Sequence, residues 1–429
     1  MDKKTDCSFI VKGDICYNIS PTQFDARKDA YIVCVEGISQ GVFDEIPEKY
    51  QGLSLIDYSG MLITPGLNDI HVHAPQYTFR GIAMDLELLD WLNTYTFPEE
   101  SKYEDLKYTS KAYDIFVDDL KHSATTRAAV FATLHVPATV FLMDKLEKTG
   151  LKAYVGKVNM DRNSPEFLCE NSAEASLQAT REWIEETRDR YSNVQPILTP
   201  RFTPTCSDEL MGGLGNLAQE YNLPVQSHLS ENLLEIDWVK QLCPWSTCYG
   251  QTYEHFCLLG GQNNAIMAHC VYSSDEEISL MKRAGTYIAH CPQSNTALAS
   301  GIAPIKRYLD EGMNVGLGTD VAGGPCLSMF RAISDAVSVS KLRWRYVDQN
   351  FVPLTIQEAF YVATLGGGSF FGKVGSFAEG YEFDALVLND SDIRSVRELT
   401  IPQRIERYAY LSQEGGTIVQ KYVSGVKVL

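Results

Sequence analysis

Five of the eight histidines stand at or near the carboxyl end of a short apolar run: His71, His73, His228, His269 and His290. Asp320 closes another run of the same kind. Imidazole nitrogens and carboxylate oxygens are ligands that zinc accepts, and the same groups act as acids and bases beside a bound ion. The residue types therefore point to metal-assisted proton transfer, provided that the fold brings these ends together.

An H-x-H pair is the first part of this candidate metal site. His71 and His73 lie two residues apart in a predicted strand, so both imidazoles project from the same face and can reach one ion. Together with His228 and Asp320 they make a set of three histidines and one carboxylate. That set suits zinc, and iron or another divalent ion is also possible. The alternative is a group of unrelated buried histidines.

Two further residues are candidates for acid–base catalysis. Glu231 lies three residues after His228, and we expect it to carry a proton from a zinc-bound water to the substrate. Bound zinc lowers the pKa of water from about 15.7 toward about 7. The alternative is a glutamate placed at a helix start by the helix dipole. His269 is assigned to catalysis, because four ligands already complete the usual set; Asp320 can also accept a proton while bound.

Composition restricts the possible partners. The chain has 429 residues and a formal net charge of −18, with no local basic stripe, which argues against nucleic-acid binding. Its eleven cysteines are scattered without a C-x-x-C pair, which is typical of a reducing compartment. The first ten residues lack the apolar core of a signal peptide, and no apolar run has the length of a membrane span. We therefore expect a cytoplasmic protein without a membrane partner.

The elements that must position the candidate site alternate along the middle of the chain. Short apolar runs predict strands at 70–73, 128–131, 153–157, 196–199, 225–228, 265–269, 287–290 and 315–320. Stretches of helical period lie between several of them, at 174–190, 208–221, 275–284 and 303–311. Eight such units predict an α/β fold with a (β/α)8 TIM-like barrel. The carboxyl ends of its strands meet at one face, where active sites form.

Both ends of the chain have a different pattern. Short alternating runs separated by Gly and Pro predict strands in the first 60 residues and again in the last 45. We expect these ends to pair into one small β-sandwich domain, residues 1–63 plus 375–429. The catalytic barrel then comprises residues 64–374.

The chain resembles the amidohydrolase superfamily in the blocks Pro65-Gly-Leu-Asn-Asp-Ile-His-Val-His, Ser227-His-Leu-Ser-Glu, Ala268-His-Cys and Gly318-Thr-Asp. Further blocks resemble the guanine deaminase family within it: His71-Val-His-Ala-Pro-Gln-Tyr, Leu88-Leu-Asp-Trp-Leu-Asn-Thr-Tyr-Thr-Phe-Pro, Thr199-Pro-Arg-Phe and His290-Cys-Pro-Gln-Ser-Asn. The resemblance covers residues 62–389. It implies a metal-dependent hydrolase of purine catabolism with one zinc ion per chain. It also implies a homodimer that converts guanine and water to xanthine and ammonia.

The resemblance also implies a role for each matching position. Metal ligands fall on His71, His73, His228 and Asp320, and the catalytic positions on Glu231, His269 and Asp320. Base-binding positions fall on Gln76, Arg201, Phe202 and His228. Arg201 is a permanent donor that suits the O6 carbonyl of guanine, and Gln76 can donate and accept along the purine edge. An ion pair at the barrel rim remains the alternative for Arg201, and core packing the alternative for Phe202.

Other interpretations stay open. A related aminohydrolase or chlorohydrolase could act on another purine, a pterin or a triazine ring, and a metal-free barrel could serve as a scaffold. The H-x-E and P-C-x-x-C motifs of the other zinc deaminase design are absent from the sequence. Trp91, Tyr95 and Phe97 form an aromatic stripe, for which packing in the core or in a dimer is favoured over a substrate lid. His290 is interpreted as structural.

Overall fold

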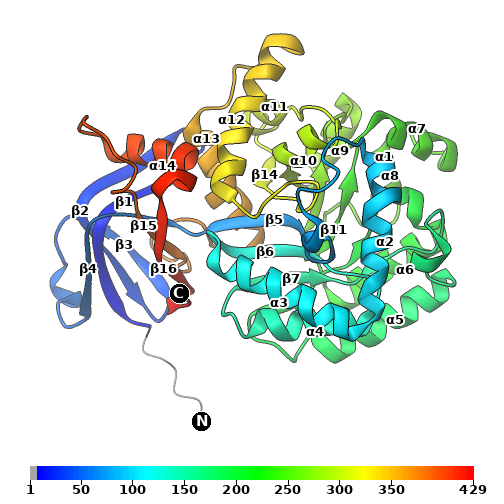
Figure 1. Ribbon diagram of the computed structural model, residues 1–429, viewed down its shortest axis with the longest axis horizontal. Helices are drawn as coiled ribbons and strands as arrows, with labels where there is room; N and C mark the ends of the chain where they lie inside the picture. The colour runs from blue at the N-terminus through cyan, green and yellow to red at the C-terminus, as the bar shows by residue number, and fades with distance from the viewer. Residues whose placement is uncertain (1–6) are drawn as a thin grey trace.

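The computed structural model describes residues 7–429 and contains an eight-stranded parallel sheet beside a smaller sheet (Figure 1). Neighbouring strands of the large sheet follow the order β11-β12-β13-β14-β5-β6-β7-β9. Their bounds are β5 (Leu67–His73), β6 (Thr125–Phe131), β7 (Lys152–Gly156), β9 (Val194–Pro196), β11 (Val225–Leu229), β12 (Ala265–His269), β13 (Tyr287–His290) and β14 (Asn314–Leu317). Backbone hydrogen bonds of Leu198 with Pro224 and Gln226 join its two edges, as in the predicted (β/α)8 barrel.

Helices follow most of the barrel strands and cover the outside of the sheet (Figure 1). The longer ones are α3 (Leu106–His122), α4 (Val136–Glu147), α5 (Ala173–Thr187), α6 (Asp208–Tyr221), α7 (Leu233–Leu242), α9 (Asp275–Ala284) and α12 (Met329–Tyr346). The shorter ones are α1 (Leu88–Trp91), α2 (Phe97–Glu100), α8 (Tyr249–Glu254), α10 (Pro292–Ala297), α11 (Ile305–Asp310) and α13 (Ile356–Tyr361). Ser274 is the N-cap of α9, since its side chain accepts from Glu277 N.

Two predicted strands end earlier than expected. The run at 315–320 is a strand only to Leu317, so the expectation that Asp320 closes a strand was wrong. Thr319 donates from its backbone N and its hydroxyl to the side chain of Asp69, and this anchor directs the chain into a loop. The run at 196–199 divides at Pro196, and β10 (Thr199–Pro200) pairs instead with β8 (Val158–Asn159). Proline has no N–H to continue the ladder.

Both ends of the chain share one seven-stranded sheet, in the order β17-β16-β15-β4-β1-β2-β3. Its strands are β1 (Phe9–Ser20), β2 (Gln23–Val35), β3 (Ile38–Phe43), β4 (Ser54–Pro65), β15 (Ala385–Asn389), β16 (Thr417–Val423) and β17 (Val426–Lys427). Helix α14 (Ile401–Gly415) packs on this sheet (Figure 1). Strands from both chain ends thus lie in one sheet, as predicted. Residues 1–6, on which part of the signal-peptide prediction depends, lie outside the described residues.

A buried ion cluster joins the two sheets. Arg127 on β6 of the barrel donates to Asp384 (2.6 Å) and to Glu382 (2.7 Å), which precede β15 of the terminal sheet. Lys152 on β7 also contacts Glu382, at 2.8 Å. Lys421 on β16 donates to the backbone oxygen of Ser123 (2.9 Å) before β6. Because an unpaired buried charge is costly, these contacts hold the barrel and the terminal sheet in one relative position.

Replacing Arg127 with methionine is expected to lower the free energy of unfolding by about 3–5 kcal/mol, because Asp384 is left as an unpaired buried charge. Urea denaturation measures the change. Arg181→Met is the matched control, since Arg181 makes a similar paired contact with Glu220 at the surface. That exposed pair contributes no more than about 1 kcal/mol. Equal destabilisation by both substitutions would contradict a locking role for Arg127.

Glu382 gives the joint a pH dependence. Burial raises its pKa, but the charge of Arg127 and the hydrogen bonds from Arg127, Lys152 and Ser424 together lower the pKa from 4.5 to about 2. A lowered carboxyl pKa stabilises the folded state above the unfolded value, and this contribution is lost as the pH falls from 4.5 toward about 2. We therefore expect Glu382→Gln to destabilise the protein at pH 7 and progressively less below pH 4.5. Chemical denaturation at several pH values tests this; a difference from the unsubstituted protein that stays constant with pH is the opposing result.

None of the helices in residues 7–429 has the length and apolar character needed to cross a membrane.

Candidate active site

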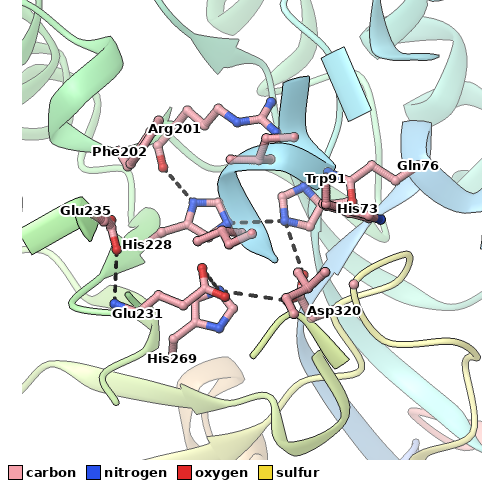
Figure 2. Close-up of a pocket in the computed structure, with 14 residues that line it drawn as sticks. His73, Gln76, Trp91, Arg201, Phe202, His228, Glu231, Glu235, His269 and Asp320 are labelled. Carbon is pink, nitrogen blue, oxygen red and sulfur yellow. Dashed lines mark hydrogen bonds and ion pairs between the residues drawn. The ribbon is translucent and has the colours of Figure 1, made fainter. Parts of the chain in front are cut away.

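The predicted catalytic side chains converge on one pocket at the carboxyl ends of the barrel strands (Figure 2). The space between its lining atoms is about 450 Å³, part of which is open to solvent. Its lining contains most of the residues singled out in the sequence: His73, Gln76, Arg201, Phe202, His228, Glu231, His269 and Asp320. His71 lies directly beneath them, with no exposed surface.

The four predicted metal ligands point their ligand atoms at one another. Nε2 of His73 lies 3.3 Å from Nε2 of His71 and 3.2 Å from Nε2 of His228. Oδ1 of Asp320 lies 3.2 Å from Nε2 of His71 and 3.4 Å from Nε2 of His73. Atoms bound to zinc at about 2.0–2.1 Å in a tetrahedron stand about 3.3–3.4 Å apart. The measured separations therefore fit a tetrahedral cation site.

The protonation of the histidines also fits a cation. His228 donates from Nδ1 to the backbone oxygen of Arg201 at 2.6 Å, so its Nε2 offers a lone pair to the centre of the set. Burial lowers the pKa of His73 and of His228 well below the ordinary value, which keeps both rings neutral. Lone pairs that face one another without a proton between them repel, and a bound cation removes this repulsion. The arrangement of these four side chains therefore fits a cation site better than it fits a group of unrelated buried residues.

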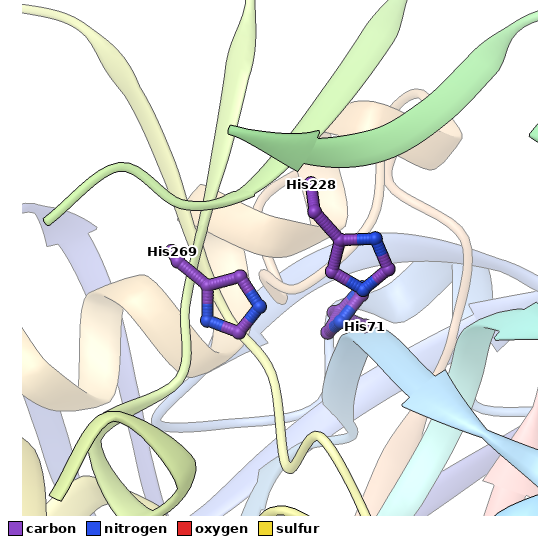
Figure 3. Close-up of side chains that lie close together, drawn as sticks. All are labelled: His71, His228 and His269. Carbon is purple, nitrogen blue, oxygen red and sulfur yellow. The ribbon is translucent and has the colours of Figure 1, made fainter. Parts of the chain in front are cut away.

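His269 lies close to this set but is held by other groups. Its ligand nitrogen lies within 4.8 Å of those of His71 and His228, and Figure 3 shows the three rings near one another. Its Nδ1 donates to Asn295 at 2.8 Å, while its Nε2 lies 3.4 Å from Glu231 and 3.8 Å from Asp320. This position faces both carboxylates across the pocket, and it agrees with the assignment of His269 to catalysis.

A loop after β14 delivers the carboxylate ligand. Gly318 lies so close to His71 that an added Cβ would stand 2.8 Å from that residue's Cβ, so only glycine permits the approach. Asp320 donates from its backbone N to the oxygen of His71 at 2.9 Å and has a positive φ of 48°. Thr319 is tied to Asp69 of the same strand β5. Strand β5 therefore carries two candidate ligands and positions a third through its backbone.

Glu231 is buried beside the candidate metal site. Ser300 donates to its Oε1 at 2.8 Å, and its Oε2 faces His269. Its backbone N donates to the carboxylate of Glu235 (Figure 2). Glu235 lies in the first turn of helix α7 and forms a capping box with Asn232. Burial raises the pKa of Glu231 above the ordinary value. A carboxyl group with a raised pKa is better matched to taking and giving a proton near neutral pH.

The base-binding candidates lie on the opposite wall of the pocket. Gln76 and Arg201 are both buried, and each donates to the carboxylate of Glu100 on α2. The ion pair weighed for Arg201 thus exists, and the residue lines the pocket as well. Phe202 lines the same wall with 7% of its surface exposed.

Some residues of the site were not recognised in the sequence. Glu100, Asn295 and Ser300 are buried polar side chains that carry no metal-ligand spacing, so nothing in a single sequence separates them from ordinary polar residues. Trp91, assigned to packing in the core or in a dimer, lines the pocket together with Leu88 and Leu92. The sequence shows the helical spacing of these three residues. It does not show whether their common face points into the pocket or into the core.

The remaining aromatic and histidine candidates lie outside the pocket lining. Tyr95 has 38% of its surface exposed, and Phe97 is buried with the guanidinium of Arg201 over its ring at 5.1 Å. His290 is buried at the end of β13, where burial lowers its pKa to about 3. A neutral, buried His290 agrees with a structural role.

Comparison with known proteins identifies the family. The amidohydrolase family matches residues 62–427. The guanine deaminase of Dictyostelium discoideum is 39% identical over 383 residues, which are 87% of this chain and 84% of that protein. The guanine deaminase of Homo sapiens is 40% identical over 85% of this chain and 82% of its own length. A crystal structure of guanine deaminase from C. acetobutylicum with bound guanine is 47% identical, with a TM-score of 0.95, and covers 98% of this chain and 100% of that one. The chain therefore belongs to the amidohydrolase family.

Proposed function

We propose that this chain is a guanine deaminase, which hydrolyses guanine to xanthine and ammonia. The observation that carries the proposal is the convergence of His71, His73, His228 and Asp320 on one point, beside Glu231 and a pocket. The likeness to guanine deaminases extends over most of the chain and includes a structure with bound guanine. A metal-free scaffold would not need these separations between ligand atoms.

One zinc ion per chain is the cofactor we propose, with iron as the alternative, held by the same four residues. When bound, it would lower the pKa of a water molecule toward about 7 and so supply hydroxide at neutral pH. A cation at this point also explains why Nε2 of His228 is left without a proton, since Nδ1 carries it.

The protein's own groups handle the protons. Guanine is proposed to lie with C2 toward the candidate metal site, and Glu231 takes a proton from the attacking water and delivers it to N3 of the base. Ser300 holds Oε1 of Glu231, which leaves Oε2 on the side of His269. His269, fixed by Asn295, is placed to stabilise the oxygen that adds to C2. The proton of the added hydroxyl then passes to the 2-amino group; the C2–N bond breaks, ammonia leaves and the C2 oxo group of xanthine forms.

The opposite wall is proposed to recognise the base. Arg201 and Gln76 donate toward the O6 edge, while Phe202 and Trp91 supply apolar walls for a flat ring. His228 borders the same space. The substrate is a small neutral base, so the net charge of −18 does not oppose its binding in the pocket. Nucleic acids are not expected to bind to this chain.

The wider organisation is also proposed. Residues 1–63 plus 375–429 form a small β-sandwich domain, and residues 64–374 form the catalytic barrel; the seven-stranded sheet from both chain ends supports this division. A cytoplasmic homodimer is proposed as well. Exposed apolar side chains near the end of α12, including Leu342, Tyr346 and Val352, support a partner surface there.

A spectrophotometric assay of guanine conversion, with and without a chelator, tests the proposed function. We expect the metal-loaded protein to form xanthine and ammonia in equal amounts. Chelation should abolish turnover and added zinc should restore it, because the four candidate ligands converge on one cation position beside the pocket. A panel of other aminopurines, a pterin and a chlorotriazine serves as the control. If one of these compounds is turned over faster than guanine, that compound and not guanine is the substrate. Absence of metal from the purified protein would favour a metal-free scaffold.

A further inference from the structure

Glu100 is the buried carboxylate to which both polar base-binding candidates are tied. Its Oε2 accepts from Nη1 of Arg201 at 2.5 Å, and its Oε1 accepts from Nη2 of Arg201 at 3.2 Å. The same Oε1 accepts from Nε2 of Gln76 at 2.9 Å. Glu100 itself is not among the residues that line the pocket. It therefore lies behind the base-binding wall and acts on that wall from outside.

These bonds fix which atoms the wall presents. A carboxylate accepts and does not donate, so the amide nitrogen of Gln76 must face Glu100. Oε1 of Gln76 accepts from the backbone N of Ala322 at 3.3 Å. The amide oxygen is thus engaged, and the hydrogen that remains on Nε2 is a donor. Arg201 has donors only. The wall formed by Gln76 and Arg201 therefore presents N–H donors to a bound base, while the amide oxygen of Gln76 is turned to the backbone of Ala322.

We propose that Glu100 is a positioning residue that holds Gln76 and Arg201 with their N–H donors toward the base, and so restricts the pocket to purines with an oxo group at C6. This inference rests on the proposed function and adds the device that sets its specificity. An oxo group and the neighbouring ring nitrogen N7 both accept hydrogen bonds. A 6-amino group would instead bring its own donors against the donors of the wall.

The charge of Glu100 matters as well as its geometry. Arg201 is 3% exposed and Glu100 is 2% exposed, so neither charge is hydrated. The carboxylate neutralises the guanidinium and lets it remain beside a neutral base. Without this partner, Arg201 would turn toward the nearest other acceptor, and the amide of Gln76 would be free to rotate. Both changes would present an acceptor or a gap where the oxo group binds.

The test compares guanine with 2,6-diaminopurine in Glu100→Gln. Both bases carry the 2-amino group that leaves: hydrolysis at C2 converts guanine to xanthine, and 2,6-diaminopurine to 6-amino-2-oxopurine, with one ammonia released in each case. For a 6-amino base without detectable turnover, competitive inhibition measures its binding. We expect Glu100→Gln to raise KM for guanine about 10- to 100-fold and to change kcat by less than about 3-fold. The preference for guanine should fall by a similar factor.

Glu99→Gln is the matched control. Glu99 is the preceding residue of α2, but its carboxylate bonds Lys102, Thr78 and Tyr108 and does not contact the base-binding wall. It should leave KM and the preference between the two bases unchanged. Metal content, measured for every variant, should equal that of the unsubstituted protein. Where Glu100→Gln does not fold, Glu100→Asp retains the charge, withdraws it by one methylene and should also weaken the preference.

Two outcomes would overturn the proposal for Glu100. One is an equal loss of activity toward both bases, which would mark a purely structural role. The other is an unchanged preference in a folded, metal-loaded Glu100 variant. Failure of the proposed function looks different, because the unsubstituted protein would then form no xanthine from guanine.

Discussion

Glu231→Gln is expected to lower kcat for guanine by about 10²–10⁴-fold while the protein keeps its metal. Glutamine retains the size of the side chain and can still accept from Ser300, but it cannot take and return a proton. The candidate ligand atoms belong to other residues, so their arrangement should be unaffected. Steady-state kinetics and elemental analysis of the same sample measure both quantities.

Glu235→Gln is the control for this prediction. Glu235 is a second buried glutamate at the pocket, but its carboxylate accepts from the backbone N of Glu231 and of Asn232 and from the hydroxyl of Tyr249. Glutamine can still accept from that backbone N, so we expect a change in kcat of less than about 10-fold. Near-normal turnover by metal-loaded Glu231→Gln would contradict the proton-shuttle role. It would favour the alternative, in which Glu231 is a glutamate placed near a helix start by the helix dipole.

Asp320→Ala is expected to weaken metal binding by more than about 100-fold, and turnover should fall with it. Loss of a group that only orients a ligand typically costs about 10–100-fold in metal affinity, and Asp320 is itself a candidate ligand. Its carboxylate lies 3.2 Å from Nε2 of His71 and 3.4 Å from Nε2 of His73. Competition with a chelator of known affinity, followed by elemental analysis, measures the loss.

Two comparison variants make this prediction specific. Thr319→Val removes the hydroxyl that donates to Asp69 and should give the smaller loss of about 10–100-fold, because it affects only the loop that carries the ligand. His290→Asn changes a buried histidine at the same end of the barrel that lies outside the pocket lining, and it should leave the metal content unchanged. Full metal occupancy in Asp320→Ala would exclude Asp320 from the ligand set.

The strands and the metal set were predictable because their signals are local. The predicted strands at 265–269 and 287–290 have the same bounds as β12 and β13. The predicted strand at 70–73 ends with β5, which begins earlier, at Leu67. Parallel strands place their carboxyl ends at one face, so the positions of His71, His73, His228 and His269 followed from the strand assignment. The path of the chain to Asp320 was not predicted. Its strand ends at Leu317, and the contact of Thr319 with Asp69 involves residues 250 positions apart in the sequence.

The sequence by itself determined the barrel, the pairing of both chain ends in one sheet, and the candidate residues for metal binding and acid–base chemistry. These depend on periodicity and on residue types that a strand or a close approach requires. Tertiary structure alone decided that Glu100 lies behind Arg201 and Gln76, that Trp91 faces the pocket, and that Arg127 joins the two sheets. The direction of a buried side chain depends on the segments packed around it, and those segments are distant in the sequence.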